Sequence, residues 1–240
     1  MNGDFLLEIT VESVRGAQAA ERGGADRIEL CAALHTGGLT PPPALLREVC
    51  NAVRIPVFAM IRPREGGYDY SPAEFSAMQR QLEESRAAGA QGAVFGILRA
   101  GDHAVDVARA SELVRRAAPM QITFHRAFDE TPDMLRALED VISTGAHRIL
   151  TTGGAQSVLE GAATLGQLIA QAAGRITIVP GKGIQPANFA EVLRRIPARE
   201  FHSGLGTILR YGAEEYAAFE AAVRQLRQGG IGADPAAPGS

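Results

Sequence analysis

Short, nearly continuous apolar runs alternate along the chain with alanine-rich segments in which apolar residues recur at helical spacing. Runs of this kind, rich in β-branched residues, are typical of strands that are buried on both faces. Strands that alternate with amphipathic helices predict a parallel sheet covered by helices. We count eight such units along the chain. Their strands are predicted at Leu6–Val11, Arg27–Cys31, Val57–Arg62, Ala93–Leu98, Ile122–Arg126, Ile149–Thr152, Ile176–Val179 and Glu200–Ser203.

Capping chemistry predicts where several helices begin. Ser71 is followed three residues later by Glu74, a spacing typical of a capping box, in which each side chain bonds the other residue's backbone N–H. Ser157 and Glu160 repeat that spacing. Other helix starts are predicted at Thr40–Pro41, at Gln185–Pro186 and at Ala213, the last helix running to about Gln228.

The same helix-to-strand turn recurs three times in the sequence, at residues 24–28, 89–93 and 145–149, and each copy begins with Gly-Ala. Glycine at that place supplies the left-handed backbone that ends a helix. Eight repeated strand–helix units predict an α/β fold, a single (β/α)8 TIM barrel over residues 1–228. An open doubly wound sheet is the structural alternative. Residues 229–240, rich in Gly, Pro and Ala, are predicted to be a disordered tail.

Composition and charge exclude several classes of protein. The chain has 24 basic and 27 acidic residues, with no basic cluster, which argues against a nucleic-acid partner. The sequence has no run of about 18 apolar residues, so we predict no membrane span. The first ten residues have neither a basic region nor a long apolar one, so we expect a cytoplasmic protein. Two cysteines, Cys31 and Cys50, are too few for a disulfide scaffold.

Polar residues gather where the predicted strands end. In a TIM barrel the reactive groups stand at the C-terminal ends of the strands and in the loops that follow. A charged side chain inside an apolar strand must be paired or must face a polar pocket, because an unpaired buried charge is too unfavourable to persist. The candidate pocket residues are Glu8, Glu29, Arg62, His125, Arg126, Asp129 and His202.

These residues leave a catalytic and a structural role open. Carboxylates and histidines that face one cavity can act as general acid and base, since burial and neighbouring charge bring their pKa values toward neutral pH. The same charges can instead form a structural lattice inside the barrel, for example Glu8 or Glu29 with Arg62 or Arg126.

Two further chemistries are available at the strand ends. Cys31 with His125 or His202 offers thiolate and imidazole, the ligands that select copper(I) or zinc, although a lone buried cysteine often only packs. The loops after the last two strands lie where barrels often hold a phosphate on backbone amides. The candidate phosphate-binding residues are Gly181, Lys182, Gly183, Gly204 and Gly206, of which Lys182 is the chain's only lysine.

Five motifs stand in one register along the chain. They are Gly23-Gly24-Ala25-Asp26-Arg27-Ile28-Glu29-Leu30-Cys31, Gly37-Gly38-Leu39-Thr40-Pro41, Met60-Ile61-Arg62-Pro63-Arg64, Thr123-Phe124-His125-Arg126-Ala127-Phe128-Asp129 and Arg148-Ile149-Leu150-Thr151. With these motifs the chain resembles the copper homeostasis protein family CutC over most of residues 5–206. One departure is Lys182, which stands where the family more often has glycine. Others are Gly67-Tyr68, in place of an acidic or amide residue followed by phenylalanine, and the stiff Thr40-Pro41-Pro42-Pro43.

The resemblance implies a cytoplasmic single-domain barrel that is a homodimer or higher homo-oligomer, with a role in copper homeostasis. It implies copper(I) binding at the C-terminal face of the barrel, and Cys31 is the position on which such binding would depend. The alternative function is a metal-independent TIM-barrel enzyme that acts on a small anionic metabolite, phosphorylated or carboxylated, by general acid/base chemistry. Both functions remain open at this stage, with a copper ion or a small ligand as the partner.

Overall fold

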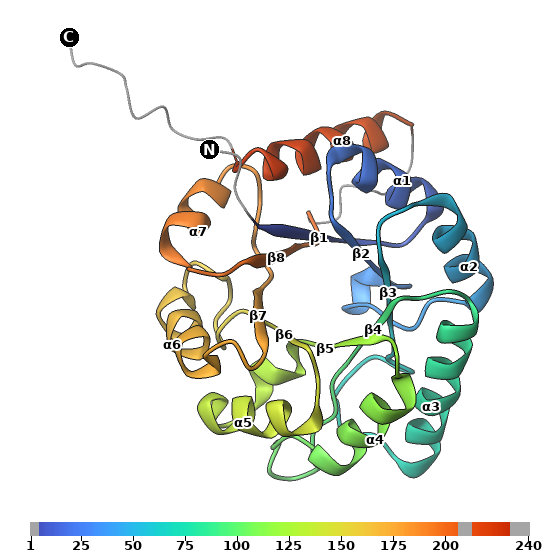
Figure 1. Cartoon of the computed structure of the whole chain (residues 1–240), viewed down its shortest axis with the longest axis vertical. Coiled ribbons are helices and arrows are strands. Elements are labelled where there is room, and N and C mark those ends of the chain that lie inside the picture. Colours follow the sequence, from blue (N-terminus) through green and yellow to red (C-terminus); the bar gives the residue numbers. More distant parts are fainter. Residues whose placement is uncertain (1–4, 206–212, 231–240) are drawn as a thin grey trace.

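Eight parallel strands form a closed barrel in this computed structural model, which describes residues 5–205 and 213–230 (Figure 1). The strands pair in chain order from β1 to β7, and β1 also pairs with β8. A parallel bridge between Gly181 and His202 closes the remaining seam between β7 and β8. The predicted TIM barrel is therefore confirmed. The strands are β1 (Leu6–Val11), β2 (Arg27–Leu30), β3 (Val57–Met60), β4 (Gly92–Phe95), β5 (Gln121–Phe124), β6 (Arg148–Thr151), β7 (Thr177–Pro180) and β8 (Glu200–Ser203).

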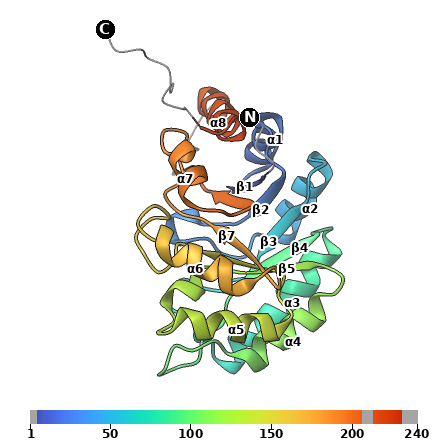
Figure 2. The same cartoon turned by 60° about the vertical axis from the view of Figure 1, so that its left-hand side comes forward.

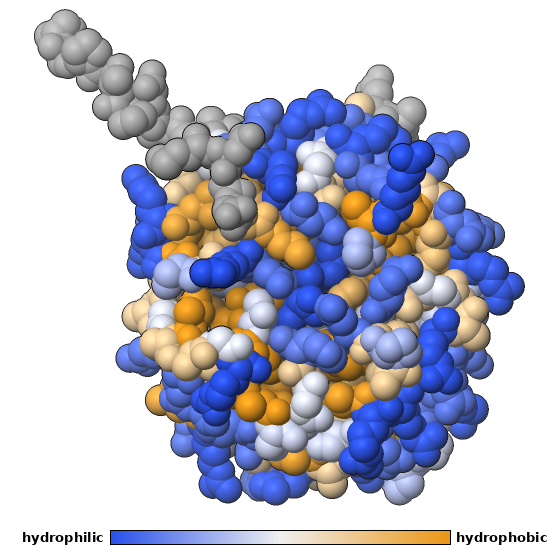
Figure 3. Space-filling model, viewed as in Figure 1, coloured by the Kyte–Doolittle hydropathy of each residue, from blue (hydrophilic) through white to orange (hydrophobic). Residues whose placement is uncertain are grey.

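Helices surround the barrel and lie between it and solvent (Figures 1 and 2). In the space-filling view, hydrophilic residues occupy most of the periphery (Figure 3). The helices are α1 (Val14–Gly23), α2 (Pro43–Ala52), α3 (Pro72–Ala87), α4 (Val107–Ala117), α5 (Met134–Thr144), α6 (Ala162–Ala172), α7 (Phe189–Arg195) and α8 (Ala213–Arg227). Two short 3-10 turns, Leu34–Thr36 and Arg126–Glu130, follow β2 and β5.

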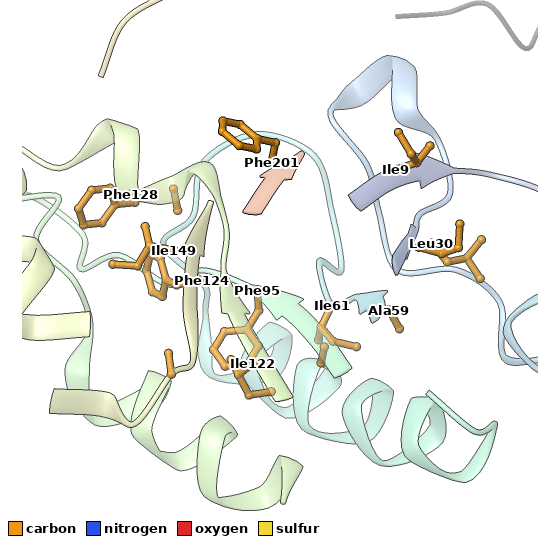
Figure 4. Close-up of a cluster of buried hydrophobic side chains, with 14 of the residues drawn as sticks. Ile9, Leu30, Ala59, Ile61, Phe95, Ile122, Phe124, Phe128, Ile149 and Phe201 are labelled. Carbon is orange, nitrogen blue, oxygen red and sulfur yellow. The ribbon is translucent and has the colours of Figure 1, made fainter. Parts of the chain in front are cut away.

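The main hydrophobic core lies between the strands and the helices. Ile9, Leu30 and Phe124 are fully buried there (Figure 4). Because side chains alternate along a strand, the strand residues next to these outward-facing ones point into the barrel. This alternation places Glu8 and Glu29 inside, and both are buried.

Several predicted boundaries hold, most strand bounds differ from the prediction, and three predicted helix starts are wrong. One of the three is α7, which begins at Phe189 rather than at Gln185–Pro186. Ser71 forms the expected capping box with Glu74. Ser157 does accept a hydrogen bond from the Glu160 N–H, but it closes a turn, and α6 begins only at Ala162. Helix α2 begins at Pro43 rather than at Thr40–Pro41, because the Thr40 hydroxyl instead accepts the backbone N–H of Arg62.

The three repeated turns behave as predicted, since Gly24, Gly89 and Gly145 all have positive φ, at 96°, 102° and 83°. Among the described residues no helix is long and apolar enough to cross a bilayer. Gly206 and most of the predicted tail lie outside the described residues.

Candidate functional site

A cavity of about 350 Å³ opens at the C-terminal end of the barrel. The strands and the loops after them supply its walls, as the fold predicts. Of the predicted residues, Glu29, Arg62, His125, Arg126, Lys182, His202 and Gly204 line it; Glu8, Cys31, Asp129, Gly181 and Gly183 do not. The other lining residues are Thr10, Leu34, Thr36, Gly37, Met60, Tyr68 and Leu150.

Glu8 and His202 meet beneath the cavity because β1 and β8 pair in register at these two residues. The Nδ1 of His202 lies 2.7 Å from Glu8 Oε1, and Arg27 Nε donates to Glu8 Oε2. Burial alone would raise the pKa of Glu8, but the Arg27 charge and the His202 hydrogen bond hold that pKa well below its usual range. Glu8 is therefore ionised, and its contact fixes a proton on His202 Nδ1.

The charges continue from Glu8 toward the N-terminal end of the barrel as a lattice. Arg27 also donates to Glu200, at 2.7 Å, and Arg148 donates to the same carboxylate oxygen, at 2.9 Å. Both guanidinium groups lie over the ring of Phe58. The expected ion-pair lattice thus exists, but Glu8 pairs with Arg27 rather than with Arg62 or Arg126. Glu29 has no arginine partner among the described residues.

Glu29 brings Cys31 and His202 into one cluster. Its Oε1 accepts hydrogen bonds from the Thr10 hydroxyl at 3.3 Å and from the Cys31 thiol at 3.4 Å. The Thr10 oxygen in turn lies 2.9 Å from His202 Nε2. Ligand atoms of Glu8, Glu29 and His202 all lie within 4.8 Å of one another.

Burial sets the protonation of this cluster. It raises the pKa of Glu29, and it raises the pKa of the Cys31 thiol well above its usual value, with the Glu29 charge adding to the effect. For His202 burial acts in the opposite direction, but Glu29 and Glu8 outweigh it and raise the pKa. These shifts favour the neutral thiol of Cys31 and the protonated imidazole of His202.

Arg62 forms a second wall of the cavity. Its Nη1 donates to the carbonyl oxygens of Thr36 and Gly38, both at 3.1 Å, and its Nη2 donates to Gly66 at 2.9 Å. The guanidinium carbon lies 5.2 Å from the centre of the Tyr68 ring. Although Arg62 is buried, no carboxylate of the described residues forms an ion pair with it.

His125 stands beside Tyr68, with 4.8 Å between the ring centres. Its Nδ1 accepts the backbone N–H of Ala127 at 3.1 Å. Burial, with the Arg62 charge, lowers the pKa of His125 to about 3. The ring is therefore neutral, and its single proton lies on Nε2, which has no hydrogen-bond partner among the described residues.

Asp129 organises the loop after β6 instead of facing the cavity. Its carboxylate accepts the backbone N–H groups of Thr152, at 3.1 Å, and Gly154, at 3.2 Å. Arg126 Nε donates to the same carboxylate at 3.1 Å, and the half-exposed Arg126 lines the cavity mouth.

The glycine-rich loop after β7 contains a close backbone approach and a residue with positive φ. A Cβ on Gly181 would lie 2.4 Å from Leu150 and 3.1 Å from His202, so the chain passes close to the barrel wall. Lys182 has φ +89°, in the region that favours glycine. Its backbone carbonyl accepts the N–H of Val158 at 3.3 Å.

Thr10 and Arg27 are polar residues of the site that sequence reasoning did not identify. Arg27 precedes Glu29 by two residues and Thr10 follows Glu8 by two, so strand alternation alone places each pair on the inner face. Tyr68 lies in a loop, and only the three-dimensional structure shows that its ring packs against both Arg62 and His125.

Comparisons with known proteins point to one family. The sequence model of the CutC family matches residues 5–207. A CutC family protein of Agrobacterium fabrum is 44% identical over 235 residues, 93% of each chain. The human copper homeostasis protein cutC homolog is 45% identical over 198 residues, 82% of this chain and 72% of its own.

Solved structures agree with these sequence matches. The crystal structure of a CutC protein from Streptococcus agalactiae has a TM-score of 0.79 at 25% identity, covering 83% of this chain and 98% of its own. An aldolase at 15% identity has a TM-score of 0.65, covering 85% of this chain and 92% of its own, and shares the fold alone.

Proposed function

The chain belongs to the CutC family of copper homeostasis proteins, and we propose that it serves this role by binding copper(I) at the C-terminal face of the barrel. The ligands are the Cys31 sulfur and the His202 Nε2. Thiolate and imidazole are ligands that suit copper(I), whereas a carboxylate pair alone favours harder cations.

The observation that carries this proposal is that Cys31 contacts Glu29 and His202 contacts Thr10, two side chains that are hydrogen-bonded to each other. The thiol donates to Glu29 Oε1, and the imidazole contacts the Thr10 hydroxyl that donates to the same oxygen. Met60, whose thioether is a further soft ligand, packs in the same buried cluster as Cys31. His125 is left out of the ligand set, because its Nδ1 is engaged by Ala127 and its ring lies against Tyr68.

Glu8 supports His202 as a ligand. A histidine that binds a metal through Nε2 commonly donates its other N–H to a carboxylate, which fixes the ring and its tautomer. The contact between His202 Nδ1 and Glu8 Oε1 is of that kind. Copper(I) then displaces the thiol proton of Cys31 and the Nε2 proton of His202, so binding releases protons.

An anaerobic copper(I) titration against a competing chelator tests the proposal. We expect the wild type to take one equivalent from the chelator and Cys31→Ser to take none. His202→Gln is expected to bind more weakly. Cys50→Ser is the matched control, because Cys50 is the other free cysteine and lies in α2, away from the cavity. Equal binding by Cys31→Ser and the wild type would refute the ligand assignment.

A second candidate function is metal-independent catalysis on a small anionic metabolite by general acid/base chemistry. The observation that favours it is the buried Arg62 guanidinium, which lines the cavity without a carboxylate partner. An anion in the cavity would supply the missing negative charge. The two functions separate in the laboratory: Arg62→Gln should abolish binding of the anion and leave copper(I) affinity unchanged, whereas Cys31→Ser should do the reverse.

A further inference from the structure

Three buried polar atoms that have no hydrogen-bond partner among the described residues belong to side chains that line the cavity. They are Oε2 of Glu29, Nε of Arg62 and Nε2 of His125, and all three residues are buried. A buried polar atom that lacks a partner costs free energy comparable to a lost hydrogen bond. A ligand that contacts these atoms would recover that free energy, so their chemistry describes the ligand.

His125 offers a donor of fixed character. Because Nδ1 accepts the Ala127 N–H, the neutral ring carries its proton on Nε2 and can only donate there. The matching ligand atom is an oxygen with a free lone pair. Arg62 packs against the same Tyr68 ring as His125 and carries a positive charge, which makes an anionic oxygen the better match.

The unused N–H groups of Arg62 match the shape of a carboxylate. Three N–H groups of its terminal nitrogens already donate to the carbonyls of Thr36, Gly38 and Gly66. One terminal N–H remains, and Nε has no partner among the described residues. Adjacent N–H groups of a guanidinium suit the two oxygens of a planar carboxylate, and His125 Nε2–H adds a further donor.

The rest of the cavity describes the remainder of the ligand. Leu34, Met60 and Leu150 give it apolar lining, which suits a short hydrocarbon chain. Glu29 Oε1 already accepts hydrogen bonds from Thr10 and Cys31, so the unpartnered oxygen is Oε2. A hydroxyl group of the ligand could donate to Oε2.

We propose that the cavity binds a small aliphatic hydroxycarboxylate, with its carboxylate between Arg62 and His125 and its hydroxyl at Glu29. The proposal rests on the second candidate function, because it names the class of anion that the cavity takes. It does not depend on copper(I) binding, since neither Arg62 nor His125 is a proposed copper ligand.

Isothermal titration with four matched compounds tests the ligand class. The probes are 2-hydroxybutanoate, butanoate without the hydroxyl, 2-hydroxybutanamide without the charge, and inorganic phosphate. We expect 2-hydroxybutanoate to bind best, and the compounds that lack the hydroxyl or the charge to bind about tenfold or more weakly. Tighter binding of phosphate would overturn the proposal in favour of a phosphate ligand. If none of the four binds, the proposal and the second candidate function both fail.

Two substitutions of His125 separate binding from a structural role. In His125→Asn the side-chain oxygen can still accept the Ala127 N–H, but no donor reaches the Nε2 position. In His125→Gln the side-chain NH2 can reach that position, but the bond to Ala127 is lost. We expect Asn to weaken 2-hydroxybutanoate binding about tenfold or more, and Gln to retain much of it.

The control is His147→Asn. His147 Nδ1 also accepts a backbone N–H, that of Ile122 at 3.0 Å, but this residue lies outside the cavity. The His147→Asn variant should bind 2-hydroxybutanoate as tightly as the wild type does. Unchanged binding by His125→Asn would overturn the proposal. Copper(I) titration of the same preparations should show no change in any of the three variants, so a failure of the copper proposal would be seen separately.

Discussion

Replacing Glu8 by glutamine tests the buried charge lattice that supports the floor of the cavity. In the wild type, two guanidinium groups, Arg27 and Arg148, face two carboxylates, Glu8 and Glu200. Glu8→Gln keeps the size and one hydrogen-bonding oxygen but removes one negative charge. Two buried positive charges then share a single carboxylate.

The expected loss follows from the burial of the pair. The side chains of Arg27 and Glu8 are 3% and 1% exposed, so water cannot take the place of the missing charge. Removing one partner of such a pair costs about 3–5 kcal/mol of stability. For a chain of this size, that corresponds to a melting temperature lower by roughly 6–20 °C.

Urea unfolding followed by circular dichroism measures the effect. Glu139→Gln is the control, because Glu139 pairs with Arg175 on the surface, where both side chains are nearly half exposed and the pair contributes little. The double variant Glu8→Gln, Arg27→Met should recover part of the loss, since it leaves no unpaired charge at Arg27. A loss below about 1 kcal/mol for Glu8→Gln would refute the claim that the lattice depends on this pairing.

Three other outcomes are expected. Lys182→Gly should stabilise the protein by about 1 kcal/mol in urea unfolding, because it removes a side chain at φ +89°; a destabilised variant would show that the Lys182 side chain makes a contact that outweighs the strain. Asp129→Asn should cost about 1–3 kcal/mol, because it disturbs the N–H contacts of the loop after β6, and should leave the copper(I) affinity of the titration unchanged; a changed affinity would link that loop to the metal. The pKa of His125, lowered to about 3, means that the unfolded chain binds a proton below about pH 6.5 and the folded one does not, so stability falls as pH falls through that range. Between pH 7.5 and 5 the wild type should therefore lose about 2 kcal/mol more than His125→Asn, and equal losses would show that His125 is not held neutral.

Much of the fold could be predicted from the sequence because the strands are short, apolar and evenly spaced. β1 and β8 have the predicted bounds; Glu12 follows the first of these runs, and Arg199 and Gly204 flank the second. Helix starts were less predictable. The Ser157–Glu160 spacing satisfies a capping pattern locally, yet it closes a turn, and the chain runs on to Gly161 before α6 begins.

The candidate site was predictable in its residues but not in its pairing. The strand ends identify Glu29, Arg62 and His202 as pocket residues, because a barrel places those ends around one cavity. The register of the strands decides which charged side chains pair with each other. In this barrel the register places Glu8 opposite both Arg27 and His202. Side-chain direction also lies beyond sequence patterns, as Asp129 shows by turning toward the β6 loop.

The most direct test of the copper assignment is the copper K-edge absorption spectrum of the protein loaded with one equivalent of copper(I). The cluster of Cys31 and His202 around Glu29 predicts both sulfur and imidazole nitrogen in the first coordination shell. The sulfur contribution from Cys31 should be lost in Cys31→Ser and kept in Cys50→Ser. A wild-type shell of nitrogen and oxygen alone, or one that Cys31→Ser leaves unchanged, would contradict the account.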